Sequence, residues 1–187
     1  MPEPTDLHHL IERSKLGDST AFAGLIRMHQ QYAQTLALRL LLDEEEAREA
    51  TQEAFVRVWQ HLPRFDEGVK FTTWLYTIVT NICLDTLRAR KRSRALFVPY
   101  PVDELPDSLD IEARHDNEQL LNLIRSLSSR LTEAQRLVFT LRDLQDLSVE
   151  EVREISGMNA NTIKTHLCNA RRNIRALLQA MHEKERK

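Results

Sequence analysis

Polar and basic side chains gather near the end of the chain, in the stretch NTIKTHLCNARRNIRALL from 161 to 178. Its apolar residues recur at helical spacing, so the polar residues share the opposite face of one helix. Lysine, asparagine and threonine can bond to the edges of bases, and arginine suits phosphates. The stretch therefore predicts either a solvated face or a DNA-binding face that contains Thr162, Lys164, Thr165, His166, Asn169 and Arg172.

A short helix and a tight turn are predicted just before this stretch. Ser148 followed by Glu151 has the capping-box pattern of a helix start, Gly157 marks a turn, and Asn159 can cap the next helix. This order is typical of a helix-turn-helix, whose second helix enters the major groove of DNA. Because helical hairpins with polar faces are also common, these residues alone leave DNA binding and solvation both open.

A second polar surface is predicted on a helix from Thr72 to about Arg92. Aromatic residues on this helix precede the basic run RARKRSR, a combination that single-strand binders use to hold a backbone and stack bases. We interpret Trp74 as a core residue and Asn81 as a reader of an unstacked base. The candidate contacts on this surface are Lys70, Thr73, Tyr76, Thr77, Asn81, Arg88, Lys91 and Arg92.

A third surface, on the segment TQEAFVRVWQHL and the acids before it, carries charges of both signs. Such a face repels nucleic acid as much as it attracts it. It is either simply solvated or binds a protein partner. Its candidate partner-binding residues are Glu49, Gln52, Glu53 and Arg57.

The elements that position these surfaces are all predicted to be helices, because no strand candidate of useful length occurs. In the first part they cover about 5–15, 19–40, 43–62 and 72–92, with Ser19 as the cap of the second. In the second part they cover about 120–127, 132–141, 148–156 and 160–178, with Thr132 as a cap. We therefore expect an all-α fold.

The segment from 95 to 116 separates two domains in our interpretation. It holds three of the six prolines and several acids, and it has no sustained periodicity. We expect a flexible linker between small helical domains at 1–94 and 117–187. Its acidity fits a solvated tether, or a decoy that lies against a basic groove until nucleic acid displaces it.

Composition excludes several other classes of function. The net charge is only -2, but basic and acidic residues are segregated along the chain, and a local field depends on that segregation. The small net charge therefore does not argue against nucleic-acid binding.

The cysteines and the other reactive residues indicate no site for chemistry. Cys83 and Cys168 are far apart without nearby ligands, so we expect two buried thiols and no metal site or cofactor. No catalytic set or glycine-rich phosphate loop occurs, so we expect no enzyme. Without a membrane span or a signal peptide, we expect a cytoplasmic protein.

These features together resemble the extracytoplasmic-function sigma factors, the small two-domain initiation subunits of bacterial RNA polymerase. The resemblance covers nearly all of the chain outside the linker. It rests on the phrases QEAF at 52–55, F-x-T-W-L-Y at 71–76 and T-I-K-T-x-L-x-x-A-R-R at 162–172, in this order and separation.

The resemblance implies that the chain directs core RNA polymerase to specific promoters, under the control of an anti-sigma factor. The mixed-charge helix would bind the polymerase β′ coiled coil. Asn81 and the loop from Phe65 to Phe71 would hold a base extruded from the minus-ten element. The second domain would read the minus-thirty-five duplex with Arg142, Lys164, Thr165 and Asn169, and would contact the β flap. The free protein would be a monomer.

Departures from the family pattern limit what the resemblance implies. Glu49 stands where relatives often carry Asp, and Asn169 stands where Arg is frequent. Because asparagine pairs with adenine and arginine with guanine, the promoter sequence cannot be transferred from a relative. Two alternatives remain: a stand-alone helix-turn-helix regulator that binds duplex DNA as a dimer, and an adaptor that keeps the polymerase-binding face without promoter recognition.

Overall fold

The computed structural model describes residues 4–96 and 130–185 of the chain. The described residues form helices and turns without any strand, so the all-α prediction is confirmed. The helix predicted at 120–127 lies outside the described residues. So does the predicted linker, except for its first two positions, which complete a helix that ends at Leu96.

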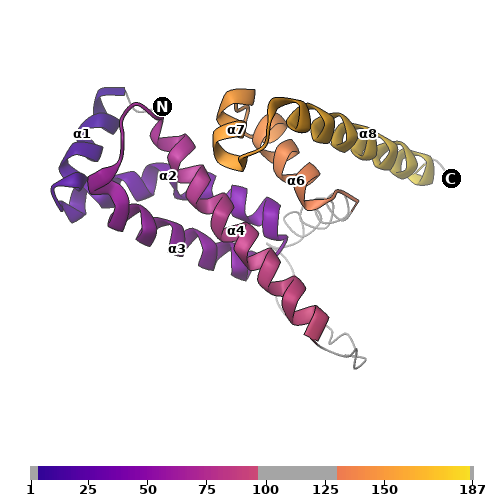
Figure 1. Cartoon of the computed structure of the whole chain (residues 1–187), viewed down its shortest axis with the longest axis horizontal. Helices are drawn as coiled ribbons and strands as arrows, with labels where there is room; N and C mark the ends of the chain where they lie inside the picture. The colour runs from indigo at the N-terminus through magenta and orange to yellow at the C-terminus, as the bar shows by residue number, and fades with distance from the viewer. Residues whose placement is uncertain (1–3, 97–129, 186–187) are drawn as a thin grey trace.

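Four helices form the first domain (Figure 1): α1 (Pro4–Lys15), α2 (Ser19–Leu41), α3 (Glu44–His61) and α4 (Phe71–Leu96). Helices α2, α3 and α4 pack together, and α1 packs on α2. The apolar stripe of α4 is buried, since Leu75 and Val79 are fully inaccessible. Trp74 is half-buried and packs against the core, with its ring 4.8 Å from that of Phe65, which agrees with its interpretation as a core residue.

The starts of α2 and α3 are fixed by acidic caps. Asp18 accepts hydrogen bonds from the backbone N–H groups of Thr20 and Ala21, at 2.9 and 3.0 Å. The prediction that Ser19 caps α2 is therefore wrong; Ser19 is the first residue inside the helix. Asp43 caps α3 in the same way, and three glutamates in its first turn favour the positive end of the helix dipole.

The second domain contains α6 (Glu133–Phe139), the π-helical turn η2 (Thr140–Leu144), α7 (Val149–Ser156) and α8 (Ala160–Glu185). All three predicted caps are confirmed: capping boxes at Thr132 and Ser148, and Asn159, whose side chain accepts from the N–H of Thr162 at 2.9 Å. Ile163 and Ala170 on α8 are fully buried. Their burial turns the polar face of α8 outward.

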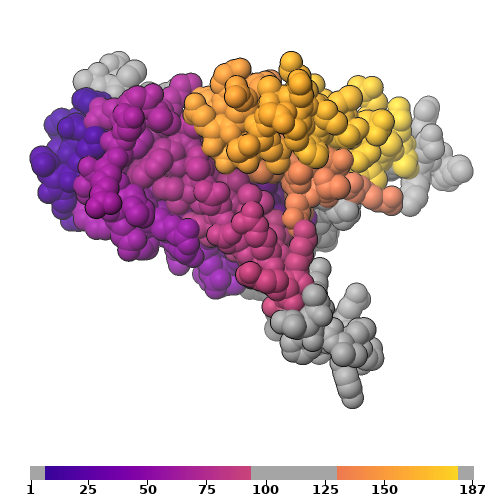
Figure 2. Space-filling view, in the orientation of Figure 1, coloured from indigo at the N-terminus to yellow at the C-terminus, as the bar shows by residue number. Residues whose placement is uncertain are grey.

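The two domains contact each other along α4. Figure 2 shows the second domain, in orange and yellow, lying against the magenta surface of α4, and α7 supplies most of this contact. One continuous cluster of buried apolar side chains extends from Val79 in α4 to Val152 in α7. The contact between the domains was not predicted from the sequence.

Gly157 sets the angle between α7 and α8, because its φ of +69° lies in the left-handed region. A Cβ at this position would meet nothing within 4 Å, so only the backbone conformation resists substitution. We predict that Gly157→Ala lowers the free energy of unfolding by about 1–2 kcal/mol. Gly157→Asn should lose less, since asparagine adopts this conformation more readily. Urea unfolding followed by circular dichroism measures both variants, and equal losses would contradict the explanation.

Candidate nucleic-acid and protein interfaces

The outer face of α8 carries the residues predicted to read a duplex. Lys164 and Thr165 are exposed, and Thr162, His166 and Asn169 are half-buried along the same helix. The orientation of this face follows from the burial of Ile163 and Ala170 on the opposite side. The first turns of α8 therefore present donors and acceptors to the solvent, as direct readout of base edges requires.

Two arginines of α8 make contacts that the sequence did not indicate. Arg171 forms two hydrogen bonds with the carboxylate of Asp143 in η2, at 2.8 and 2.6 Å. Arg172 is exposed and donates to the side-chain oxygen of Asn169 at 3.1 Å. The pair leaves the amide NH₂ of Asn169 free to donate. Arg171 thus ties α8 to η2, whereas Arg172 remains near the polar face.

Arg142 lies in η2, outside α8. Its guanidinium donates to the carbonyl oxygen of Leu147, and its Nε is buried without a partner among the described residues. Arg142 therefore closes the turn between η2 and α7. A contact between Arg142 and DNA stays a prediction from the resemblance.

Cys168 is exposed on α8, so the prediction that both thiols are buried is wrong for this residue. Position 168 lies about 140° around the helix from the buried Ile163, at 100° per residue. Cys83 in α4 is buried as predicted, and burial raises the pKa of its thiol to about 12. The Cys83 thiol is therefore protonated at neutral pH.

The predicted single-strand surface of α4 is only partly accessible. Asn81 is exposed and Thr77 is half-buried, but Thr73 and Tyr76 retain only 2% and 6% of their accessible surface. The hydroxyl oxygen of Thr73 has no hydrogen-bond partner among the described residues. The hydroxyl of Tyr76 donates to Gln145 of the second domain at 3.4 Å. The second domain therefore covers the start of this surface.

The basic run after Asn81 has several separate roles. Arg90 donates to Glu46 at 2.8 Å and to the carbonyl oxygen of Leu41 at 3.0 Å, so it holds α4 to the α2–α3 corner. Arg88 pairs with Asp85 at 2.8 Å. Arg92 is exposed and forms no hydrogen bond or ion pair within the part of the chain that the structure describes. Charges that look equivalent in the sequence are thus unequally available.

Two lysines of the predicted single-strand surface pair with glutamates of the second domain. The Nζ of Lys70 lies 2.8 Å from a carboxylate oxygen of Glu151 in α7, and the Nζ of Lys91 lies 2.9 Å from Glu133 in α6. The second oxygen of Glu151 accepts from the backbone N–H and the hydroxyl of Ser148. The same carboxylate therefore caps α7 and holds Lys70.

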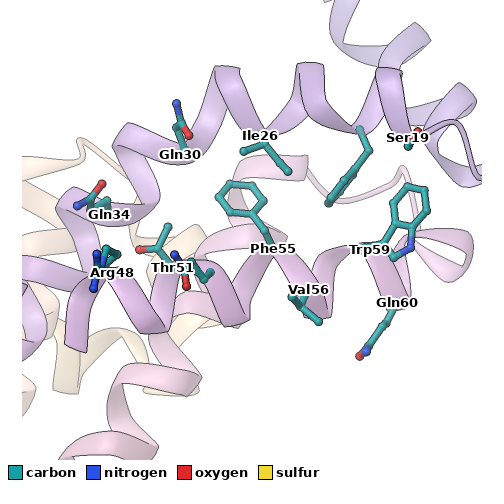
Figure 3. Close-up of a pocket in the computed structure, with 12 residues that line it drawn as sticks. Ser19, Ile26, Gln30, Gln34, Arg48, Thr51, Phe55, Val56, Trp59 and Gln60 are labelled. Atoms are coloured by element: carbon teal, nitrogen blue, oxygen red, sulfur yellow. The ribbon is translucent and has the colours of Figure 1, made fainter. Parts of the chain in front are cut away.

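The mixed-charge face of α3 has the expected polar residues at its surface. Glu49, Gln52 and Glu53 are exposed, and Arg57 is half-buried and pairs with Glu53. Beside them the sequence analysis missed an apolar groove of about 610 Å³ between α2 and α3. Figure 3 shows Ile26, Phe55 and Trp59 pointing into this groove from the two helices.

Exposed apolar side chains make the groove unusual for a solvated face. Val56 and Trp59 keep 54% and 37% of their accessible surface, and the Trp59 ring lies 4.8 Å from that of Phe22. Val56 and Trp59 are three positions apart, next to the buried stripe of α3. This second pair of apolar residues at helical spacing was the feature of the sequence that could have indicated the groove. A large apolar patch rimmed by polar residues marks a binding surface.

Comparison with known proteins identifies the family. Residues 25–93 match the profile of Sigma-70 region 2, and residues 121–174 match that of Sigma-70 region 4. The ECF RNA polymerase sigma factor SigW of Bacillus subtilis is 30% identical over 177 residues, which cover 90% of this chain and 95% of SigW. The chain belongs to the family of ECF RNA polymerase sigma factors.

Two solved structures share the fold of this sigma factor. CnrH, in complex with the cytosolic domain of CnrY, has a TM-score of 0.71 at 22% identity, covering 94% of this chain and 98% of CnrH. The sigma factor RpoE of Bartonella quintana, in complex with the anti-sigma factor NepR, has a TM-score of 0.66 at 22% identity, with 84% and 96% covered.

Family membership settles the class of function. A sigma factor directs core RNA polymerase to promoters and starts transcription there. The region 2 match includes α3 and α4, and the region 4 match includes α7 and the first turns of α8. The alternative of a stand-alone regulator is not favoured.

Two other kinds of site are absent from residues 4–96 and 130–185. No three His, Cys, Asp or Glu side chains there come together in a way that could hold a metal ion. No helix in the same ranges is long and apolar enough to cross a membrane.

The contact with Lys70 lowers the pKa of the Glu151 carboxyl. The hydrogen bond from Lys70, followed by that from the Ser148 backbone, lowers the pKa of Glu151 from 4.5 to about 2. The ionised carboxylate therefore stabilises the fold above pH 4.5, and this stabilisation is lost as pH falls through about 2. We predict that Lys70→Gln raises the pKa of Glu151, but not fully to 4.5, because the Ser148 donors remain.

Carboxyl NMR titration of Glu151 measures this change. Lys91→Gln is the matched control, because it removes the same charge from a lysine that pairs with Glu133 instead. An unchanged Glu151 pKa in Lys70→Gln would mean that the two domains are not in contact in solution.

Proposed function

We propose that this sigma factor binds core polymerase through the α2–α3 groove and binds promoter DNA through α8 and α4. The observation that carries the proposal is the separation of surfaces: the exposed apolar groove lies on the first domain, and the exposed face of Lys164 and Thr165 lies on the second. The chain can therefore hold a protein and a DNA duplex simultaneously. Each surface has the chemistry that its partner requires.

The α8 face suits the minus-thirty-five duplex. It is helical and polar, and Lys164 and the free NH₂ of Asn169 can donate to base edges in a major groove. Arg172 beside them suits a phosphate. The base preference of Asn169 is for adenine, so position 169 is a determinant of the promoter sequence in this proposal.

The α4 surface suits the minus-ten element after melting. Asn81 is an exposed amide on the same helix as the cationic side chains of Arg88, Lys91 and Arg92. Extruding a base costs a few kcal/mol, and a positioned amide and nearby cations offset that cost. The loop from Phe65 to Phe71 and the side chains of Thr73, Tyr76 and Thr77 complete this proposed surface.

The α2–α3 groove suits a protein helix better than nucleic acid. Its walls are aromatic and aliphatic, and its rim includes Gln52 and Arg48. We assign it to the β′ coiled coil, with Glu49, Glu53 and Arg57 as polar contacts beside the groove. An amphipathic helix that lays its apolar face in a groove is a recurring mode of recognition.

Further parts of the proposal come from the family. The division into a region 2 domain at 1–94, a linker at 95–116 and a region 4 domain at 117–187 fits the two matched ranges. The β flap contacts the second domain. Control by an anti-sigma factor is supported by the RpoE–NepR complex, a protein of the same fold. The chain works as a cytoplasmic monomer without catalysis or cofactor of its own.

The groove assignment predicts that Val56→Gln weakens binding to purified core polymerase about tenfold, or about 1.4 kcal/mol. Val56 is more than half exposed, so the substitution should leave folding stability nearly unchanged. Leu16→Gln is the matched control, since Leu16 is 88% exposed and does not line the groove. Fluorescence titration measures both affinities, and equal affinities would overturn the assignment.

The promoter assignment is tested by transcription in vitro with purified core polymerase on a genomic library. We predict that the double variant Lys164→Ala with Asn169→Ala lowers promoter-specific transcription at least about tenfold, because base contacts are lost. Its association with polymerase should be unchanged. Gln179→Ala, exposed further along α8, should have neither effect. Failure of the unmodified chain to initiate, or joint loss of both activities in the variant, would contradict the proposal.

A further inference from the structure

We infer that the second domain holds the minus-ten surface of α4 closed in the free chain, with Glu151 and Glu133 occupying lysines that would otherwise bind promoter phosphates. The inference rests on the proposed function for the identity of the excluded ligand. The closed contact itself is independent of that function. It involves side chains that neither the groove nor the α8 face uses.

The two ion pairs lie near opposite ends of the α4 surface. Lys70 precedes α4 by one residue and Lys91 lies near its last turns, so the two positions are about 30 Å apart along the helix. Between them the hydroxyl of Tyr76 donates to Gln145 of the second domain. Contacts at both ends and between them place the second domain over this face, as Figure 2 shows.

The carboxylates of Glu151 and Glu133 occupy the positions in which phosphates would bind the two lysines. A carboxylate and a phosphate both offer anionic oxygens to an ammonium group at about 2.8 Å. Lys70 cannot bring its ammonium to a phosphate in the same position while Glu151 occupies it at 2.8 Å. Glu151 is also fixed in place, because its second oxygen accepts from Ser148. This carboxylate is therefore presented to Lys70 by the start of α7.

The closed contact leaves the other two surfaces open. With the second domain in place, Val56 and Trp59 of the groove remain accessible, and so do Lys164 and Thr165 of α8. On the α4 surface, by contrast, Tyr76 is buried and its hydroxyl is bonded to Gln145 of the second domain, although Asn81 stays exposed. Polymerase can therefore dock before the domains separate, whereas a melted minus-ten strand cannot reach all of its surface.

The closure is weak enough to be reversed. The lysine side chains are 75% and 67% exposed, and exposed ion pairs stabilise only slightly and are screened by salt. A weak closed state lowers the apparent affinity for single strands in proportion to the open fraction. A scaffold that binds both domains at a larger separation shifts the population to the open state.

The test is the double variant Glu151→Gln with Glu133→Gln. Glutamine can replace glutamate in a capping box, so α7 keeps its cap while both interdomain ion pairs are lost. The matched control is Glu150→Gln with Glu154→Gln, which removes the same charge from exposed positions of α7 that have no recorded partner among the described residues. Circular dichroism verifies that both variants fold.

Two measurements are made on the full chain at low salt. Small-angle X-ray scattering gives the radius of gyration, and fluorescence anisotropy gives the affinity for labelled random-sequence DNA, single-stranded and duplex. We expect the test variant to be larger and to bind single strands about fivefold more tightly, with the gain lost at high salt. We expect the control to keep the radius of gyration and the single-strand affinity of the unmodified chain, and we expect duplex affinity to be the same in both variants.

An unchanged radius of gyration, or a gain in single-strand affinity that the control shares, would overturn the inference. Neither measurement uses polymerase or a promoter. Failure of the unmodified chain to initiate transcription would contradict the proposed function, while a salt-sensitive closed contact would stand. The two failures are therefore distinguishable.

Discussion

The buried face of α4 is the constraint on which the other surfaces depend. Leu75 and Val79 lie one turn apart and are fully buried, and burying each such side chain contributes about 1.5–3 kcal/mol. This packing fixes the rotation of α4 about its axis. Once that rotation is fixed, Tyr76 must meet the second domain and Asn81 must point to solvent. The position of each candidate contact on α4 is therefore a consequence of the core.

Local patterns in the sequence predicted most helices and caps, because these depend on neighbouring residues. The capping box of Ser148 and Glu151 is an example. The prediction failed at Asp18 and Ser19, where both residue types can cap; Asp18 also accepts a hydrogen bond from Arg13 at 2.8 Å. The second role of Glu151 was not predictable, because its partner Lys70 is 81 positions away in the chain. Pairings of that kind depend on how the domains meet.

In the candidate surfaces too, local sequence predicted the residue types, whereas contacts with distant parts of the chain decide which side chains are accessible. The mixed charge of α3 was predicted from the sequence, but the exposed Val56 and Trp59 form a groove only where α2 supplies the other wall. In the basic run, sequence could not separate Arg90, which holds α4 to the α2–α3 corner, from the exposed Arg92. Residue type gives the chemistry of a side chain, whereas availability depends on its partners.

A chain of this design should depend on polymerase for promoter binding. Each DNA surface offers few contacts, and joining them on a rigid scaffold makes the second contact effectively intramolecular. The closed contact at Lys70 and Lys91 adds a further cost to binding without the scaffold, since those ammonium groups must first leave their carboxylates. The groove of Val56 and Trp59 is accessible while the two domains are in contact. The polymerase can therefore bind the groove before the ion pairs of Lys70 and Lys91 break. The accessibility of the groove thus sets an order: polymerase first, melted DNA second.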